Sequence, residues 1–230
     1  MSAKVAHPRN VSTAGSVADI ITFSNVDGSG NRFVVFLQGC NFDCVACHNP
    51  QTIPLATGDH FCTDVTDLLS RIRRAAPFLG GITVSGGEAT LQPGFLVSLF
   101  TAVKADPDLR RLTCFVDSNG SCDDAIWRQL APATDGAMID LKCFDPTIHE
   151  QMTGQSNVPV LHSIELLAGM GKLYEVRLLI VADLNDDPAL LRRTGEWLAS
   201  IDPTMRVKVI GFRRHGARPY ELELRELTAD

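Results

Sequence analysis

The order in which short apolar segments alternate with amphipathic ones constrains the fold of this chain more than any other feature of its sequence. Six short runs rich in β-branched and aromatic residues predict strands, at 32–37, 81–85, 112–117, 136–142, 174–181 and 206–212. Between them, helices are expected near 64–76, 93–105, 122–131, 159–170 and 187–200, with Pro93 and Pro188 in first turns. Strands separated by helices form parallel sheets with right-handed crossovers. Six units are too few for a closed eight-fold barrel, so we expect an α/β fold, a partial, open (β/α)6 barrel of the TIM type.

The composition indicates one globular domain over residues 1–230, because 45% of the residues are hydrophobic, 21% are charged, and no Pro/Gly-rich linker divides the chain. No apolar run approaches the roughly 20 residues that cross a bilayer, so we expect a soluble, cytoplasmic protein without membrane contact. The net charge of -6 gives no general reason to bind nucleic acid. Locally basic stretches at 71–74 and 212–218 are more typical of solvated faces.

Three cysteines follow the first predicted strand in the sequence "CNFDCVAC", at Cys40, Cys44 and Cys47. The chain has seven cysteines and no export signal, which favours reduced thiols and metal ligation over disulfides. A closed structural metal site uses four protein ligands, so a triad leaves one coordination position open for chemistry. The plain alternative is a zinc site completed by Cys62 or His48.

Polar residues follow the other predicted strands, at the ends where parallel barrels carry their chemistry. They comprise "SGGEAT" at 85–90, "VDSNG" at 116–120, Asp140 with Lys142, Arg177 within its strand, and "FRRHG" at 212–216. Taken singly, each is explained by a turn, a cap or an exposed strand end. Together they describe a pocket for an α-amino acid, with a carboxylate for its ammonium group, a lysine for its carboxylate, and glycines that allow the backbone to approach closely.

These motifs are similar to those of a known family. "CNFDCVAC" resembles the CxxxCxxC signature of radical S-adenosylmethionine (SAM) enzymes, and "GGE" at 86–88 resembles their next motif. In order, "VDGSGNRFVVFLQGC", "CHNP", "ITVSGGEATLQP", "VDSNG" and "DLK" resemble the glycyl-radical-enzyme activating enzymes, a family that includes the pyruvate formate-lyase activating enzymes. "TCFVDSNG" with "FRRHGAR" is most similar to the YjjW-type branch. The resemblance spans about 20–218 and implies a radical SAM core.

The resemblance also implies the cofactors and the residues that hold them. One [4Fe-4S] cluster is expected on Cys40, Cys44 and Cys47, with SAM on its fourth iron, and the chain has no room for a ferredoxin-like insertion. Glu88 and the Gly86–Gly87 backbone would hold the SAM amino group, and Lys142 its carboxylate. Asp117 and Asp140 would frame a monovalent cation. The other expected cofactor-binding residues are Ala46 and His48 at the adenine, Asn49, Ser85, and a closing set of Arg177, Arg213 and His215.

The activity implied by the resemblance is oxidoreductase chemistry, in which SAM is reductively cleaved and a glycyl radical is generated on a partner glycyl-radical enzyme. The electron would come from a low-potential donor of the flavodoxin or ferredoxin type, and Asp27, Gly28 and Arg32 would face the partner protein. Two alternatives remain. One is a radical SAM enzyme that modifies a small metabolite, a peptide or RNA. The other is a non-catalytic zinc module for protein interaction.

Three positions depart from the usual family pattern. Ala46 precedes the third cysteine, where the family often has an aromatic residue, and residues 27–30 read "DGSG" where "DGPG" is common. Arg213 stands where the pyruvate formate-lyase activating enzymes have a late histidine, with His215 two residues further on. The resemblance leaves open which of these two side chains takes that role.

Overall fold

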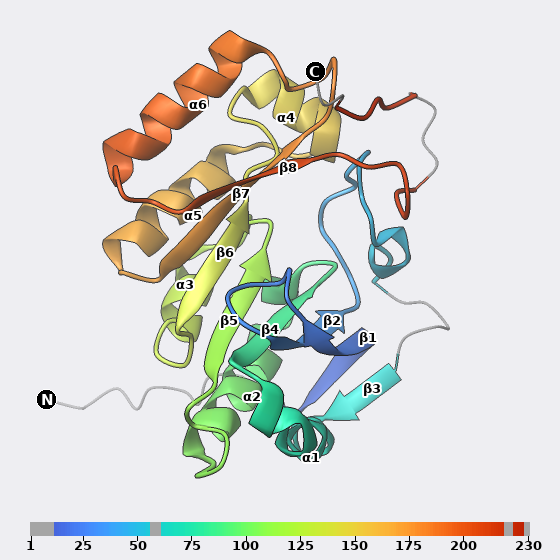
Figure 1. Ribbon diagram of the computed structural model, residues 1–230, viewed down its shortest axis with the longest axis vertical. Coiled ribbons are helices and arrows are strands. Elements are labelled where there is room, and N and C mark those ends of the chain that lie inside the picture. Colours follow the sequence, from blue (N-terminus) through green and yellow to red (C-terminus); the bar gives the residue numbers. More distant parts are fainter. Residues whose placement is uncertain (1–11, 56–60, 219–222, 228–230) are drawn as a thin grey trace, which may run out of the picture.

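The computed structural model describes residues 12–55, 61–218 and 223–227. In these segments the strands form one sheet in the order β3-β1-β2-β4-β5-β6-β7-β8 (Figure 1). Each strand from β2 onward in this order is parallel to its neighbour. The sequence prediction of six parallel strands is therefore confirmed, as β2 (Arg32–Leu37), β4 (Gly81–Gly86), β5 (Thr113–Ser118), β6 (Gly136–Asp140), β7 (Leu173–Ile180) and β8 (Val207–Gly211).

Two further strands extend the sheet beyond the predicted barrel. β1 (Ala14–Ser24) pairs antiparallel with β2, and β3 (Phe61–Asp64) pairs antiparallel with β1. Neither strand was predicted, because β1 has only two buried residues and two register shifts interrupt its alternation, while β3 has only four residues. β3 and β8 are the edges of the sheet, so the barrel is open, as predicted.

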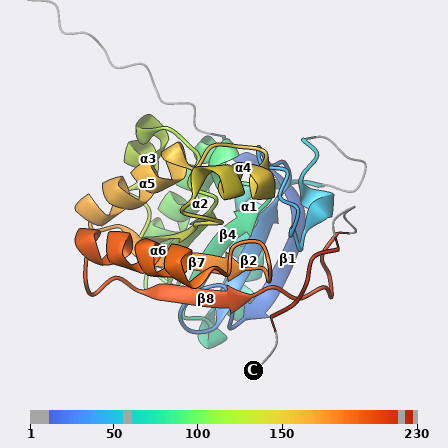
Figure 2. The same ribbon diagram turned by 90° about the horizontal axis from the view of Figure 1, so that it is seen from above.

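Helices cover the outer face of the curved sheet, as Figure 2 shows. They are α1 (Val65–Ala75), α2 (Pro93–Ala105), α3 (Asp124–Leu130), α5 (Val158–Gly169) and α6 (Pro188–Ile201), close to the five predicted ranges. Pro93 and Pro188 begin their helices as expected, and the Asp187 carboxylate caps α6 by accepting from Leu190 N at 2.8 Å. Single turns of 3-10 helix lie at Pro50–Thr52, Ala76–Phe78 and Ala89–Leu91.

A sixth α-helix, α4 (Pro146–Thr153), lies at the carboxyl end of the sheet rather than along its outer face (Figures 1 and 2). Its local signals are strong. Pro146 occupies the first turn, the Asp145 carboxylate accepts from Thr147 N at 3.0 Å, and Gly154 ends the helix in the left-handed conformation. This helix was not predicted from the sequence, although these signals are present.

The main hydrophobic core lies between the helices and the outward side chains of the strands, where Leu68, Phe95, Leu99, Trp127 and Ile164 are almost fully buried. A smaller cluster at the carboxyl end joins the cysteine loop to α4, β7 and the segment after β8, through Val45, Ala46, Cys143, Met152, Val181, Leu190 and Phe212. The described helices include none that is both long enough and apolar enough to cross a membrane.

Candidate functional site

The three predicted ligand cysteines lie in the loop at 38–49, which follows β2 at the carboxyl edge of the sheet. The last turn of α4 braces this loop. Asp43 N donates to Thr153 O at 3.0 Å, and Val45 N donates to Met152 O at 2.9 Å. Because the carbonyls of a last helical turn have no partner inside the helix, they are available to fix a neighbouring backbone. α4 therefore helps to set the path of the cysteine loop.

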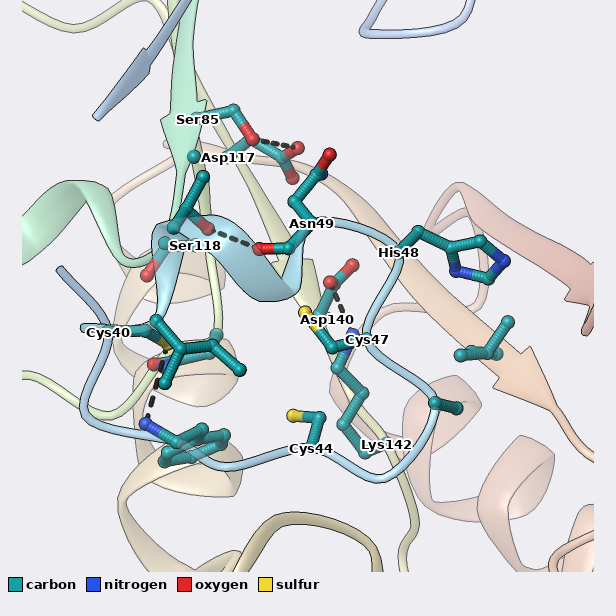
Figure 3. Close-up of a pocket in the computed structure, with 18 of the residues that line it drawn as sticks. Cys40, Cys44, Cys47, His48, Asn49, Ser85, Asp117, Ser118, Asp140 and Lys142 are labelled. Atoms are coloured by element: carbon teal, nitrogen blue, oxygen red, sulfur yellow. Dashed lines mark hydrogen bonds and ion pairs between the residues drawn. The ribbon is translucent and has the colours of Figure 1, made fainter. Parts of the chain in front are cut away.

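This loop and the strand ends line a pocket of about 230 Å³. A single water needs only about 15 Å³ on the same measure, so the pocket has room for a ligand of many atoms beside a metal centre. Figure 3 shows the three cysteine sulfurs directed toward this space. The predicted cofactor residues that line it are Cys40, Cys44, Cys47, Ala46, His48, Asn49, Ser85, Gly86, Gly87, Asp117, Asp140 and Lys142.

Burial disfavours the thiolate form of the three cysteines unless positive charge lies beside them. Burial raises the pKa of Cys40 to about 12 and that of Cys44 to about 11, and it also raises the pKa of Cys47. Phe42 N lies 3.4 Å from the Cys40 sulfur, in position to donate a hydrogen bond. Thiolates are the ligand form of cysteine, so positive metal charge at the sulfurs would offset the burial that disfavours them.

The two candidates for the fourth ligand of a zinc site lie in different places. Cys62 lies in edge strand β3 and does not line the pocket. His48 lines the pocket, and its Nε2 lies 2.8 Å from Arg213 O. Within the described residues, no group of three or more His, Cys, Asp or Glu side chains is arranged to hold a metal ion. The kind of metal centre therefore follows from the family to which the chain belongs and not from the thiol geometry.

The two glycines after β4 bring the end of this strand against the cysteine loop. Gly86 has φ +120°, and a Cβ there would lie 2.1 Å from Leu37 N. A Cβ at Gly87 would lie 2.1 Å from Gly39 O. We expected these glycines to let a ligand approach the backbone closely, and both line the pocket. The close contact that requires glycine, however, is between two segments of this chain's own backbone.

Glu88 does not face the pocket, contrary to the expectation that its carboxylate holds the SAM amino group. It is 1% exposed and does not line the cavity. Its Oε1 accepts from Thr90 N, Thr90 Oγ1 and Ser118 Oγ at 2.8, 2.6 and 2.7 Å, and its Oε2 accepts from Asn119 N at 2.7 Å. Burial raises the pKa of Glu88 and these bonds oppose the rise. The carboxylate ties the end of β4 to that of β5.

Charged groups meet where β5 and β6 end. Lys142 Nζ contacts Asp140 Oδ2 at 2.7 Å, and Asp117 Oδ2 accepts from Ser85 Oγ at 3.0 Å and from Arg177 Nη1 at 3.1 Å. Asp117 Oδ1 is buried and has no hydrogen-bond partner in the described structure. Burial raises the pKa of Asp117 to about 7, opposed by Arg177 and supported by Asp140. An unpartnered carboxylate oxygen is the kind of group that a cation would satisfy.

Two predicted arginines are buried structural residues. Arg177 is 8% exposed, does not line the pocket, and also pairs with Glu175 Oε1 at 2.9 Å. Its guanidinium is held inside the sheet by these ion pairs, so its expected role in closing over a nucleoside stays a prediction. Arg32 is 0% exposed. Its side chain therefore does not reach the surface at which a partner was expected.

The segment after β8 reaches the cysteine loop through backbone atoms and through the Arg218 side chain, which pairs with Asp43 at 2.5 Å. The His48 ring nitrogen Nε2 lies 2.8 Å from Arg213 O, and Arg218 N donates to Cys47 O at 3.0 Å. The exposed Arg213 side chain pairs with Glu226 at 3.2 Å. Neither Arg213 nor His215 lines the pocket, so the choice between them for the late-loop role stays open.

The pocket also contains residues that the sequence analysis did not assign to the cofactors. Ser118 and Asn119, held by Glu88, line it, and their place in "VDSNG" was a usable signal. Met152 lines it from α4, which was itself missed. Asp27, expected at the partner surface, lies on the pocket wall, whereas neighbouring Gly28 does not line the pocket.

Comparisons with known proteins agree with this geometry. The family model of the radical SAM superfamily matches residues 34–192. A Haemophilus influenzae protein whose name assigns it to the glycyl-radical enzyme activating enzymes is 33% identical over 220 residues, covering 86% of this chain and 82% of that protein. A pyruvate formate-lyase-activating enzyme of Streptococcus mutans is 34% identical over 218 residues, covering 93% of this chain and 81% of its own.

Among solved structures, a domain of a pyruvate-formate lyase-activating enzyme from Bacteroides vulgatus superposes with a TM-score of 0.52 at 23% identity, over 65% of this chain and 86% of that one. This likeness supports the fold, and the sequence matches assign the family. The three thiols around an open pocket are the arrangement that this family requires. The chain therefore belongs to the radical SAM superfamily and, within it, to the glycyl-radical-enzyme activating enzymes, which depend on a [4Fe-4S] cluster and S-adenosylmethionine.

Proposed function

We propose that this chain generates a glycyl radical on a partner glycyl-radical enzyme. The observation that carries the proposal is that one pocket contains the three thiols together with the charged and glycine-rich strand ends expected to hold SAM. When bound, a reduced cluster supplies the electron that splits SAM into methionine and a 5'-deoxyadenosyl radical, and this radical takes one α-hydrogen from a partner glycine to give 5'-deoxyadenosine and a glycyl radical.

The chain's own residues would bind and orient SAM. Lys142, held at 2.7 Å by Asp140, offers a cation for the SAM carboxylate. Gly86, Gly87 and Ser118 line the same pocket, and their backbone carbonyls would accept hydrogen bonds from the SAM amino group. Ala46 and His48 border the same space, where the adenine is expected.

A monovalent cation between Asp117 and Asp140 is part of the proposal. The two carboxylates end adjacent strands, and one raises the pKa of the other, which indicates repulsion between them. A bound cation would relieve this repulsion and satisfy the unpartnered Asp117 Oδ1. It would also reduce the repulsion between Asp117 and the SAM carboxylate.

The decisive experiment mixes the anaerobic, cluster-loaded protein with SAM, a low-potential flavodoxin or ferredoxin, and a glycyl-radical enzyme encoded beside this chain. Electron paramagnetic resonance should then show a doublet, split by one α-hydrogen, on the partner. Cleavage of SAM without that signal, accompanied by modification of a metabolite, a peptide or RNA, would replace the activase proposal with the small-substrate alternative.

A further inference from the structure

Arg32, the first residue of β2, is a buried cation without a charged partner. Its side chain is 0% exposed, and no carboxylate in the described segments forms an ion pair with it. Burial lowers the pKa of Arg32 to about 10, so the guanidinium is still charged at neutral pH. Since removing a cation from water is costly unless other groups replace the lost hydrogen bonds, its surroundings must provide them.

All five N–H groups of this guanidinium have oxygen acceptors. Nε donates to Thr83 Oγ1 at 2.6 Å, and Nη1 donates to Thr113 Oγ1 at 3.0 Å and Ser29 O at 3.1 Å. Nη2 donates to Thr113 O at 3.1 Å and to Ile82 O. The guanidinium also lies 4.0 Å from the centre of the Phe115 ring. These contacts fix its position and its plane.

Two of these contacts lead into the loop between β1 and β2, residues 25–31. The first is the direct bond to Ser29 O. The second runs through Thr83, whose hydroxyl oxygen accepts from Arg32 and whose proton is therefore free to be donated to Asp27 O, at 2.7 Å. The carbonyls on either side of Gly28 are thus held by one buried side chain, directly and through one hydroxyl.

The packing of the loop against Arg32 requires glycine at position 28. Its φ is +126°, and a Cβ there would lie 2.8 Å from Arg32 Cδ and 3.0 Å from Phe115 Cδ2. A larger residue would therefore be strained in its backbone and would also collide with the arginine stem. The loop packs directly on Arg32 as well as bonding to it.

The same loop is also tied to the far strands of the sheet. Val26 O accepts from Arg177 Nη2 at 3.3 Å and from Lys208 Nζ at 3.1 Å, on β7 and β8. In Figure 1 this dark blue loop lies across the inner side of the sheet. Asp27 lines the pocket, while the Val26 side chain is 61% exposed. The loop therefore connects the pocket to the open side of the barrel.

We propose that Arg32 is a positioning residue that holds the loop at 25–31 in the shape that guides the partner's glycine segment toward the pocket, without itself contacting the partner. This inference rests on the proposed function. A preformed loop lowers the ordering cost of binding an extended segment, so loss of its support should weaken partner use more than SAM chemistry.

The first test is hydrogen exchange of anaerobic, cluster-loaded Arg32→Met, with Arg71→Met as a control that removes an exposed arginine from α1. Exchange in peptides covering 25–31 should become about tenfold faster in Arg32→Met, with the cysteine loop at 40–49 unchanged. Arg32→Lys should behave alike, because lysine keeps the charge but lacks the planar fork. Unchanged exchange at 25–31, or an equal rise at 40–49, would overturn the proposal.

Gly28→Ala provides a second route, since it disturbs the loop while leaving the arginine in place. It should also speed exchange at 25–31. With the partner of the preceding section, kcat/KM for glycyl-radical formation should fall about tenfold in Arg32→Met, mainly through KM, while methionine release from SAM without partner persists. An equal loss of both activities would overturn the positioning role. If the wild type forms no glycyl radical on the partner, the proposed function is rejected instead. The hydrogen-exchange result would then still show whether Arg32 holds the loop at 25–31.

Discussion

Replacing Glu88 with glutamine tests whether this buried carboxylate braces the pocket or contacts the ligand. Glu88 accepts four hydrogen bonds, three at Oε1 and one at Oε2. Glutamine can keep its oxygen toward the first three donors, but its NH2 group then faces Asn119 N, donor against donor. An unsatisfied buried N–H costs about 1–3 kcal/mol, and the remaining bonds lose their charge assistance, so Glu88→Gln should destabilise the fold by about 2–4 kcal/mol.

The assay is thermal unfolding of anaerobic protein, with Glu150→Gln on the exposed face of α4 as the matched control. For a chain of this size the expected loss corresponds to a Tm lower by about 5–15 °C. SAM affinity should fall only moderately, because Ser118 and Asn119 shift while the carboxylate itself touches no ligand. An unchanged Tm together with a hundredfold loss of SAM affinity would refute this reasoning and restore the direct role inferred from sequence.

Three other outcomes are expected. Iron content and the visible absorbance of the cluster should disappear when any triad cysteine becomes alanine but persist in Cys62→Ala, whereas equal loss in Cys62→Ala would contradict the triad of Cys40, Cys44 and Cys47. Asp140→Asn should weaken SAM binding, measured by calorimetry, and abolish its response to monovalent cations; an undiminished response would remove Asp140 from the cation site. Burial lowers the pKa of His149 to about 4. Between pH 6.5 and 4 the unfolded state therefore binds a proton that the folded state does not, and the free energy of unfolding of the wild type should fall by up to about 3 kcal/mol relative to that of His149→Gln. Parallel curves of unfolding free energy against pH for the two proteins would contradict this prediction.

Most of the fold was predictable because its signals are local. The parallel strands are short, apolar and bounded by turns, and Pro93 and Pro188 mark helix starts. β1 was not predictable in this way, since it is exposed along much of its length and pairs with β2 through an interrupted register. α4 is different, because Asp145, Pro146 and Gly154 provide clear capping signals that the sequence analysis passed over.

The residues that line the pocket were mostly predictable from the sequence, whereas the contacts that hold these residues in place were not. Cys40, Cys44 and Cys47 follow from motif spacing, and Asp140 and Lys142 follow from their place beyond a strand. Gly86 was expected to make room for a ligand, whereas it makes room for the backbone of Leu37. The motif around Gly86 could not show whether the glycine makes room for a ligand or for backbone, because the backbone that it meets, at Leu37, belongs to another strand.

The sequence by itself determined the class of fold, the family and the three cysteines proposed as cluster ligands, since each depends on residue type at fixed spacing along one chain. Only the tertiary structure decided which charged side chains face the pocket and which are buried in its walls. Glu88, Arg32 and Arg177 belong to the second group, because donors and acceptors from strands distant in sequence surround them. A charged residue in a motif can bind a ligand or hold the motif in place, and the positions of its hydrogen-bond partners in space distinguish the two.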